Sequence, residues 1–122
     1  MTLQELYQNI GGDYGQVMRI LRMEKLVDKH IRKFSQNDVV ERLLAAGRAD
    51  DPNELFEASH AMKGICGNLG LKDLCELSSR IAEEYRPGNP RRLSDEEISQ
   101  MLALIDAKYQ KAKEEILRYE EG

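Results

Sequence analysis

Signals that begin and end α-helices divide this chain of 122 residues into short amphipathic segments. A glycine pair followed by Asp13 ends a first helix over about Leu3 to Asn9, and Asp13 can cap the next helix. Apolar residues keep helical spacing from Leu21 to Phe34. Polar residues near Ser35 to Asp38 predict a kink or break, after which a further helix continues.

The second half of the chain carries the clearest helix signals. Asp51 is an N-cap residue, with proline at the first helical position and glutamate three residues after the cap. This helix is expected to run to Leu69, with Gly70 as its C-cap. Another helix covers about Leu71 to Arg86 and stops at a Pro-Gly-Asn-Pro turn. Ser94 begins a capping box, and the last helix follows it.

These segments predict the fold class. No segment alternates as a strand does, and 41% of the residues are hydrophobic while 33% are charged, which supplies one core and a solvated surface. Amphipathic helices joined by short turns favour an all-α fold, an antiparallel up-and-down four-helix bundle with additional short N-terminal helices. We expect residues 1–122 to form a single domain.

Charge and hydropathy narrow the possible partners and locations. The net charge of −4 argues against nonspecific nucleic-acid binding, which requires a basic surface. No apolar stretch is long enough to span a bilayer, and the N-terminus lacks the arrangement of a signal peptide. Cys66 and Cys75 match no metal motif, and we expect two buried, reduced thiols. The sequence therefore predicts a cytoplasmic monomer with no metal, membrane or nucleic-acid partner.

The helix from Asp51 to Gly70 holds the informative residues. On a helical wheel, one side carries five apolar residues, namely Leu55, Ala58, Met62, Ile65 and Leu69. His60 points away from the centre of this stripe. The outer face around it holds Asn53, Phe56, Glu57, Lys63, Gly64 and Gly67. The wheel therefore predicts that His60 is exposed to solvent, which excludes a core histidine.

Two glycines distinguish this face from an ordinary solvated surface. Gly64 and Gly67 lie one and two turns beyond His60, and each should cost about 1 kcal/mol relative to alanine inside a helix. On the outer face, packing against the protein's own core cannot explain them. A strip without side chains beside an exposed imidazole suits the close approach of another surface.

The other side chains of this face agree with phosphoryl chemistry. Histidine has an ordinary pKa of about 6.5, so its neutral imidazole is a good nucleophile near pH 7. Lys63 places a positive charge one turn from His60, where phosphoryl oxygens could lie. Its alternative interpretation is a solvated surface lysine. Phe56 is an apolar residue on a polar face, which suits a docking contact.

The stretch from Ser59 to Gly70 resembles the signature of histidine-containing phosphotransfer (HPt) domains. That signature is a histidine, a Lys-Gly pair three and four residues later, and a glycine ten residues after the histidine, often preceded by Asn-Leu. His60, Lys63, Gly64 and the Asn-Leu-Gly ending at Gly70 stand in register with it. Gly12-Asp13, Phe34 and the alanine-rich turn before Asp51 are also similar to bacterial members.

The resemblance implies a four-helix bundle that carries a phosphoryl group and is not an enzyme. His60 would accept the group from an aspartyl phosphate on a response-regulator receiver domain and return it to another receiver. Lys63 would be the electrostatic helper, and Gly64 would clear space for the receiver. No cofactor is expected on this chain, because the receiver would supply Mg²⁺. A hybrid sensor histidine kinase is a further possible partner.

Other interpretations stay open at this stage. His30 lies among charged residues without a Lys-Gly companion and is best interpreted as part of a solvated helix face. The chain could be a stand-alone protein or a piece of a larger sensor. The main alternative function is a non-phosphorylated helical interaction module that docks through the His60 face. A helical subunit whose outer faces assemble into an oligomer is a second alternative.

Overall fold

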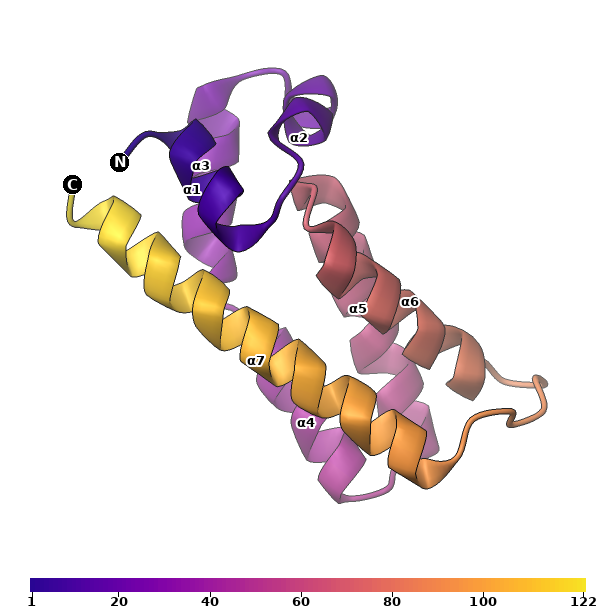
Figure 1. Cartoon of the computed structure of the whole chain (residues 1–122). Helices are drawn as coiled ribbons and strands as arrows, with labels where there is room; N and C mark the ends of the chain where they lie inside the picture. The colour runs from indigo at the N-terminus through magenta and orange to yellow at the C-terminus, as the bar shows by residue number, and fades with distance from the viewer.

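The computed structural model describes all residues, 1–122, and every regular element in it is an α-helix (Figure 1). The helices, in chain order, are α1 (Leu3–Ile10), α2 (Tyr14–Leu21), α3 (Glu24–Phe34), α4 (Val39–Arg48), α5 (Pro52–Leu69), α6 (Lys72–Tyr85) and α7 (Asp95–Glu120). None of them is both long and apolar enough to cross a membrane. The all-α prediction is confirmed.

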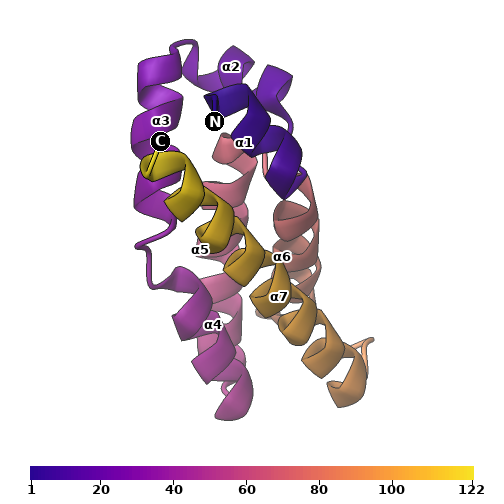
Figure 2. The ribbon, with the colours of Figure 1, turned by 60° about the vertical axis from the view of Figure 1, so that its left-hand side comes forward.

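The last four helices form a bundle. Each contacts the next along the chain, and α4 also contacts α7, so that the ring of contacts closes. The helices α1, α2 and α3 lie together at one end, where α1 packs on α7 and both α2 and α3 reach α5 (Figure 2). Both chain termini lie at this end, and the α6–α7 loop lies at the other.

The predicted caps are present at both ends of α5 and at the start of α7. The Asp51 carboxylate accepts a hydrogen bond from the Glu54 backbone N–H at 3.2 Å, and α5 ends at Gly70 with φ of 71°. Ser94 and Glu97 form the predicted capping box of α7. Because these caps satisfy backbone groups that a helix end leaves free, they fix where α5 and α7 begin.

One helix break was not predicted. The spacing from Leu21 to Phe34 reads as one continuous stretch, but the chain leaves α2 at Arg22, whose φ is 67°, and re-enters α3 after an extended Met23. Glycine or asparagine usually occupies the left-handed position at the end of a helix, so an arginine at this position does not indicate a helix end in the sequence. The Arg22 N–H donates to the Met18 carbonyl and closes α2.

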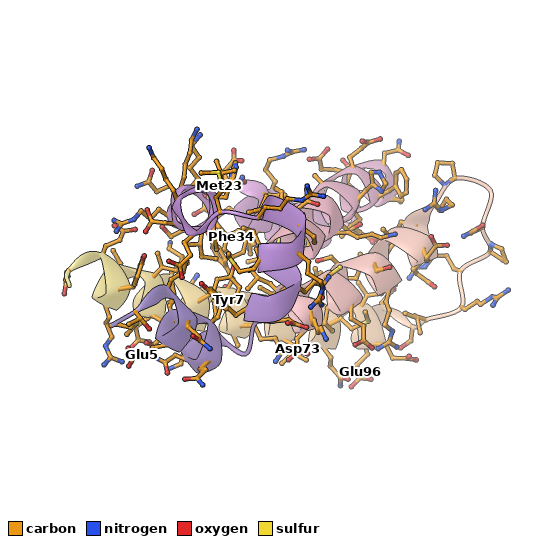
Figure 3. All side chains as sticks on the ribbon, turned by 90° about the horizontal axis from the view of Figure 1, so that it is seen from above. Glu5, Tyr7, Met23, Phe34, Asp73 and Glu96 are labelled. Carbon is orange, nitrogen blue, oxygen red and sulfur yellow. The ribbon has the colours of Figure 1, made fainter.

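Buried side chains from all seven helices form one continuous core. Tyr7 and Phe34 lie among the helices, while Met23 lies at the outer edge (Figure 3). The Phe34 ring meets Tyr109 edge-on with centroids 5.2 Å apart. The Tyr109 hydroxyl reaches the carbonyls of Phe34 and Asn37 at 3.2 and 3.0 Å, where α3 gives way to α4. These contacts hold the α3–α4 break against α7.

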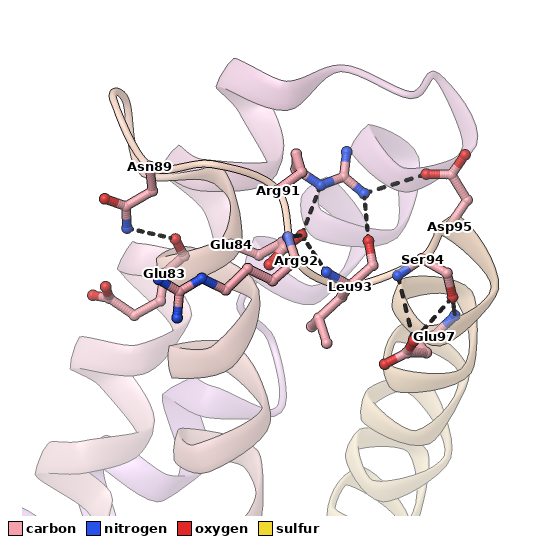
Figure 4. A network of polar contacts seen from close by, with 9 residues as sticks. All are labelled: Glu83, Glu84, Asn89, Arg91, Arg92, Leu93, Ser94, Asp95 and Glu97. Carbon is pink, nitrogen blue, oxygen red and sulfur yellow. Dashed lines mark hydrogen bonds and ion pairs between the residues drawn. The ribbon is translucent and has the colours of Figure 1, made fainter.

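The α6–α7 loop folds back on a single buried carboxylate. Glu84 accepts hydrogen bonds from the Arg91 side chain at 2.8 Å and from the backbone N–H groups of Arg92 and Leu93 at 2.9 and 2.8 Å (Figure 4). Burial by itself would raise the pKa of Glu84, but these bonds together lower it. The ionised carboxylate of Glu84 therefore ties the loop to the last turn of α6.

Candidate functional site

The helix α5 separates a buried face from an open one. Leu55, Ala58, Met62 and Leu69 are buried as the wheel predicts, while Ile65 is only half-buried. Ser59, the neighbour of His60, is fully buried and donates its hydroxyl to the Leu55 carbonyl at 2.6 Å. The helix therefore turns from core to solvent between two adjacent residues.

His60 lies on the open face and is exposed, as predicted. Asn53 and Glu57, toward the N-terminal end of α5, are also exposed. The nearby Glu54 carboxylate accepts a hydrogen bond of 2.8 Å from Arg42, so an ion pair joins α5 to α4 on this side. No group of three or more His, Cys, Asp or Glu side chains is arranged to hold a metal ion.

The two glycines beyond His60 differ from each other. A Cβ added to Gly64 would meet nothing within 4 Å, so open space lies beside this residue. Gly67 is half-buried, and a Cβ there would lie 3.6 Å from the Cys75 sulfur of α6. The prediction that both glycines lie on the outer face is therefore wrong for Gly67. The wheel cannot show this, because a neighbouring helix covers that part of α5.

The cysteines also differ from one another. Cys66 is fully buried, and burial raises the pKa of its thiol. Cys75 is only half-buried, against the expectation of two buried thiols, and its sulfur lies 3.7 Å from the Lys63 carbonyl oxygen as a weak donor. Both thiols are free. Cys75 therefore serves as a contact between α6 and the outer half of α5.

Phe56 is less open than the sequence suggests. It is half-buried and stacks on His60, with ring centroids 5.6 Å apart and ring planes inclined by 20°. The guanidinium carbon of Arg86 lies 5.5 Å from the Phe56 ring centroid. Sequence reasoning missed Arg86, which ends α6 directly before a proline, because its distance along the chain from His60 gives no signal of proximity.

Lys63 is half-buried, and its side chain takes part in none of the ion pairs of the structure. Its charge affects the pKa of Glu83 on α6. The hydrogen bonds from Arg86 lower the pKa of Glu83 most, and the Lys63 charge lowers it further. The positive charge of Lys63 thus acts across α5 and α6 without being neutralised by a direct contact.

The geometry suits group transfer to an exposed nucleophile. An exposed imidazole lies on α5, with a cation one turn away and open space at Gly64 on the same face. Phosphoryl transfer depends mostly on positioning and on stabilisation of charge. Those are the two functions that this face can supply by itself.

Comparison with known families agrees with this geometry. The family model described as Hpt domain matches residues 33–111, more than half of the chain, from the end of α3 through most of α7. The match includes all of α5. Comparisons with curated proteins and with solved structures gave no match. The chain belongs to the Hpt domain family, whose members serve phosphotransfer in two-component signalling.

Proposed function

We propose that His60 carries the phosphoryl group as an intermediate in a phosphorelay. It accepts the group from an aspartyl phosphate of one receiver domain and passes it to the aspartate of another. The observation that carries the proposal is the exposed imidazole one turn from Gly64, where an added Cβ atom would meet nothing within 4 Å. A receiver must bring its aspartate close to the ring, and this open strip admits it.

The transfer is a displacement at phosphorus. The lone pair of one imidazole nitrogen attacks the aspartyl phosphate, the N–P bond forms, and the P–O bond to the aspartate breaks. The aspartate leaves as a carboxylate, and the proton on the other ring nitrogen stays there or passes to water. The reverse reaction delivers the group to the next receiver. No net oxidation or hydrolysis is needed for either step.

The other residues of the face would assist in different ways. The free positive charge of Lys63 would lie near the phosphoryl oxygens and stabilise charge on them. Gly64 would allow close approach, while exposed Asn53 and Glu57 would meet the edge of the receiver. Gly67, half-buried beside α6, would contribute to the shape of the face and not to the open strip.

The partner in this proposal is a response-regulator receiver domain, either separate or part of a hybrid sensor kinase. The receiver would supply Mg²⁺ and the acidic residues that hold it, because metal ions neutralise charge on a phosphoryl group during transfer. This chain would then act as a carrier and need no cofactor of its own.

The test is a transfer assay with two matched variants. Receiver domains from the same genome are phosphorylated with acetyl phosphate and Mg²⁺, purified and mixed with the chain, and phosphorylated protein is separated on a phosphate-affinity gel. We expect at least one receiver to transfer an acid-labile group to the wild type. His60→Gln should abolish this uptake without loss of helicity by circular dichroism.

His30→Gln is the control, because His30 is the other histidine of the chain and is also exposed. It should take up phosphate as the wild type does. Uptake that persists in His60→Gln, or that is lost in His30→Gln, would contradict the assignment. Stable binding of a receiver without any uptake would support the alternative, an interaction module that docks through this face.

A further inference from the structure

Three side chains form a row from the end of α6 to the open face of α5. The row begins at Arg86, continues through the Phe56 ring and ends at His60, with separations of 5.5 and 5.6 Å. Phe56 and His60 lie four residues apart on one helix, where side chains lean toward the N-terminus. The imidazole therefore leans onto the Phe56 ring, in the offset parallel geometry that aromatic pairs favour.

Arg86 is itself held in place. Its Nε and Nη2 donate to the same oxygen of Glu83 at 3.2 and 2.8 Å, and the Asn89 side chain donates to the Glu83 carbonyl at 2.9 Å. The two charged side chains are 40% and 56% exposed, so their ion pair adds little to stability. Its effect is to orient the guanidinium against the Phe56 ring.

We propose that Phe56 is a positioning residue that holds the imidazole of His60 in one rotamer, and that Arg86 acts on His60 only through Phe56. The proposal rests on the proposed function, because it assigns what sets the ring before transfer. An unrestrained side chain is distributed over the staggered χ1 wells, and only some of them present a ring nitrogen to the receiver. The stack selects one well in advance.

This role differs from the docking role that the sequence suggests for Phe56. A docking residue contributes binding area to the receiver, so its loss weakens the complex. A positioning residue changes the fraction of bound complexes in which the nitrogen is aligned, so its loss slows the step within the complex. Because Phe56 is half-buried and in contact with two side chains of its own chain, the second role fits better.

The first measurement needs no receiver. Three-bond couplings in the NMR spectrum of the labelled protein report χ1 of His60, and the ring-current shift of its carbon-bound protons reports the stack. In the wild type we expect couplings that correspond to a single χ1 well of His60. Phe56→Leu should give averaged couplings and lose the ring-current shift. Phe56→Tyr should show the couplings and the ring-current shift of the wild type. Unchanged couplings in Phe56→Leu would overturn the proposal.

The second measurement follows transfer from a phosphorylated receiver over a range of receiver concentrations. Phe56→Leu should lower the maximal rate by about twofold, as expected when the ring is divided between the two χ1 wells that a helix permits, with the half-saturating concentration unchanged. Phe56→Tyr should restore the rate. A raised half-saturating concentration with an unchanged maximal rate would show docking instead and overturn the proposal.

Arg86→Gln separates the indirect route from a direct one. If Arg86 acts through Phe56, the Arg86→Gln substitution should slow transfer when Phe56 is present. It should have no further effect when it is added to Phe56→Leu. A full additional effect in the double variant would mean that the guanidinium contacts the phosphoryl group itself, against the proposal. If the wild type takes up no phosphate at all, the proposed function fails, while the NMR couplings still decide whether Phe56 positions the ring.

Discussion

The backbone N–H of Asp13 donates a hydrogen bond of 2.8 Å to the carbonyl oxygen of Gly70, so the N-cap of α2 rests on the C-cap of α5. A Cβ placed on Gly70 would lie only 2.6 Å from the Asp13 carbonyl oxygen. Lys72 adds an ion pair of 2.9 Å to the Asp13 carboxylate. The last glycine of the His60 motif therefore joins the bundle to the N-terminal helices.

Gly70→Ala should destabilise the protein by about 1–3 kcal/mol. The left-handed φ of 71° is unfavourable for alanine, and the added methyl group would push against the backbone of Asp13. Urea unfolding followed by circular dichroism measures the loss. Gly64→Ala is the control, since its Cβ meets open space, and it should leave stability unchanged or raise it by up to about 1 kcal/mol. Equal stability of the two variants would contradict this interpretation.

Gly64→Leu should slow phosphoryl transfer from a receiver while stability changes little. The leucine side chain would extend into the open strip beside His60, where the receiver has to approach. Time courses of transfer under the assay conditions above measure the effect. Ala103→Leu places the same side chain on an exposed position of α7, away from α5, and should leave transfer unchanged. Transfer at the wild-type rate in Gly64→Leu would show that close approach at this position is not required.

Glu84→Gln should destabilise the protein by about 1–3 kcal/mol, because a neutral amide replaces the charged acceptor of three hydrogen bonds. Glu83→Gln, at the exposed neighbouring position, should cost much less. Because the pKa of Glu84 is lowered in the folded protein, its contribution is complete above its ordinary value of 4.5 and is lost as the pH falls below that value. Chemical unfolding at several acidic pH values should show this loss in the wild type and a smaller one in Glu84→Gln.

Alkaline solution should also weaken the fold. The pKa of every tyrosine is raised in the folded protein. The hydrogen bond to Glu24 is the main cause for Tyr14 and raises its pKa to about 12. Burial is the main cause for the other four, Tyr7, Tyr85, Tyr109 and Tyr119. The folded state holds these protons more tightly than the unfolded state does. Its stability should therefore be constant up to the ordinary value of 10.0 and fall as the pH rises toward 12. Ultraviolet absorbance of phenolate should appear later than in unfolded protein, and simultaneous appearance would contradict the burial of these rings.

Much of the fold follows from local signals. Both ends of α5 and the start of α7 were predictable because an Asp or Ser cap and, in α5, a proline at the first turn and a C-terminal glycine act within one helical turn. The exposure of His60 followed from the 3.6-residue period alone. The break at Arg22 gave no such signal, because its φ of 67° is left-handed and arginine is not a residue type that marks this conformation.

The sequence by itself determined that His60 and its Lys-Gly pair lie on one helix and that the histidine faces solvent, since both depend on spacing within a single continuous segment. Only the tertiary structure decided what surrounds that histidine. Because α6 packs beside α5, Cys75 lies next to Gly67 and Arg86 lies against the Phe56 ring. A contact between two helices depends on their relative position and rotation, and no periodicity within either helix encodes these.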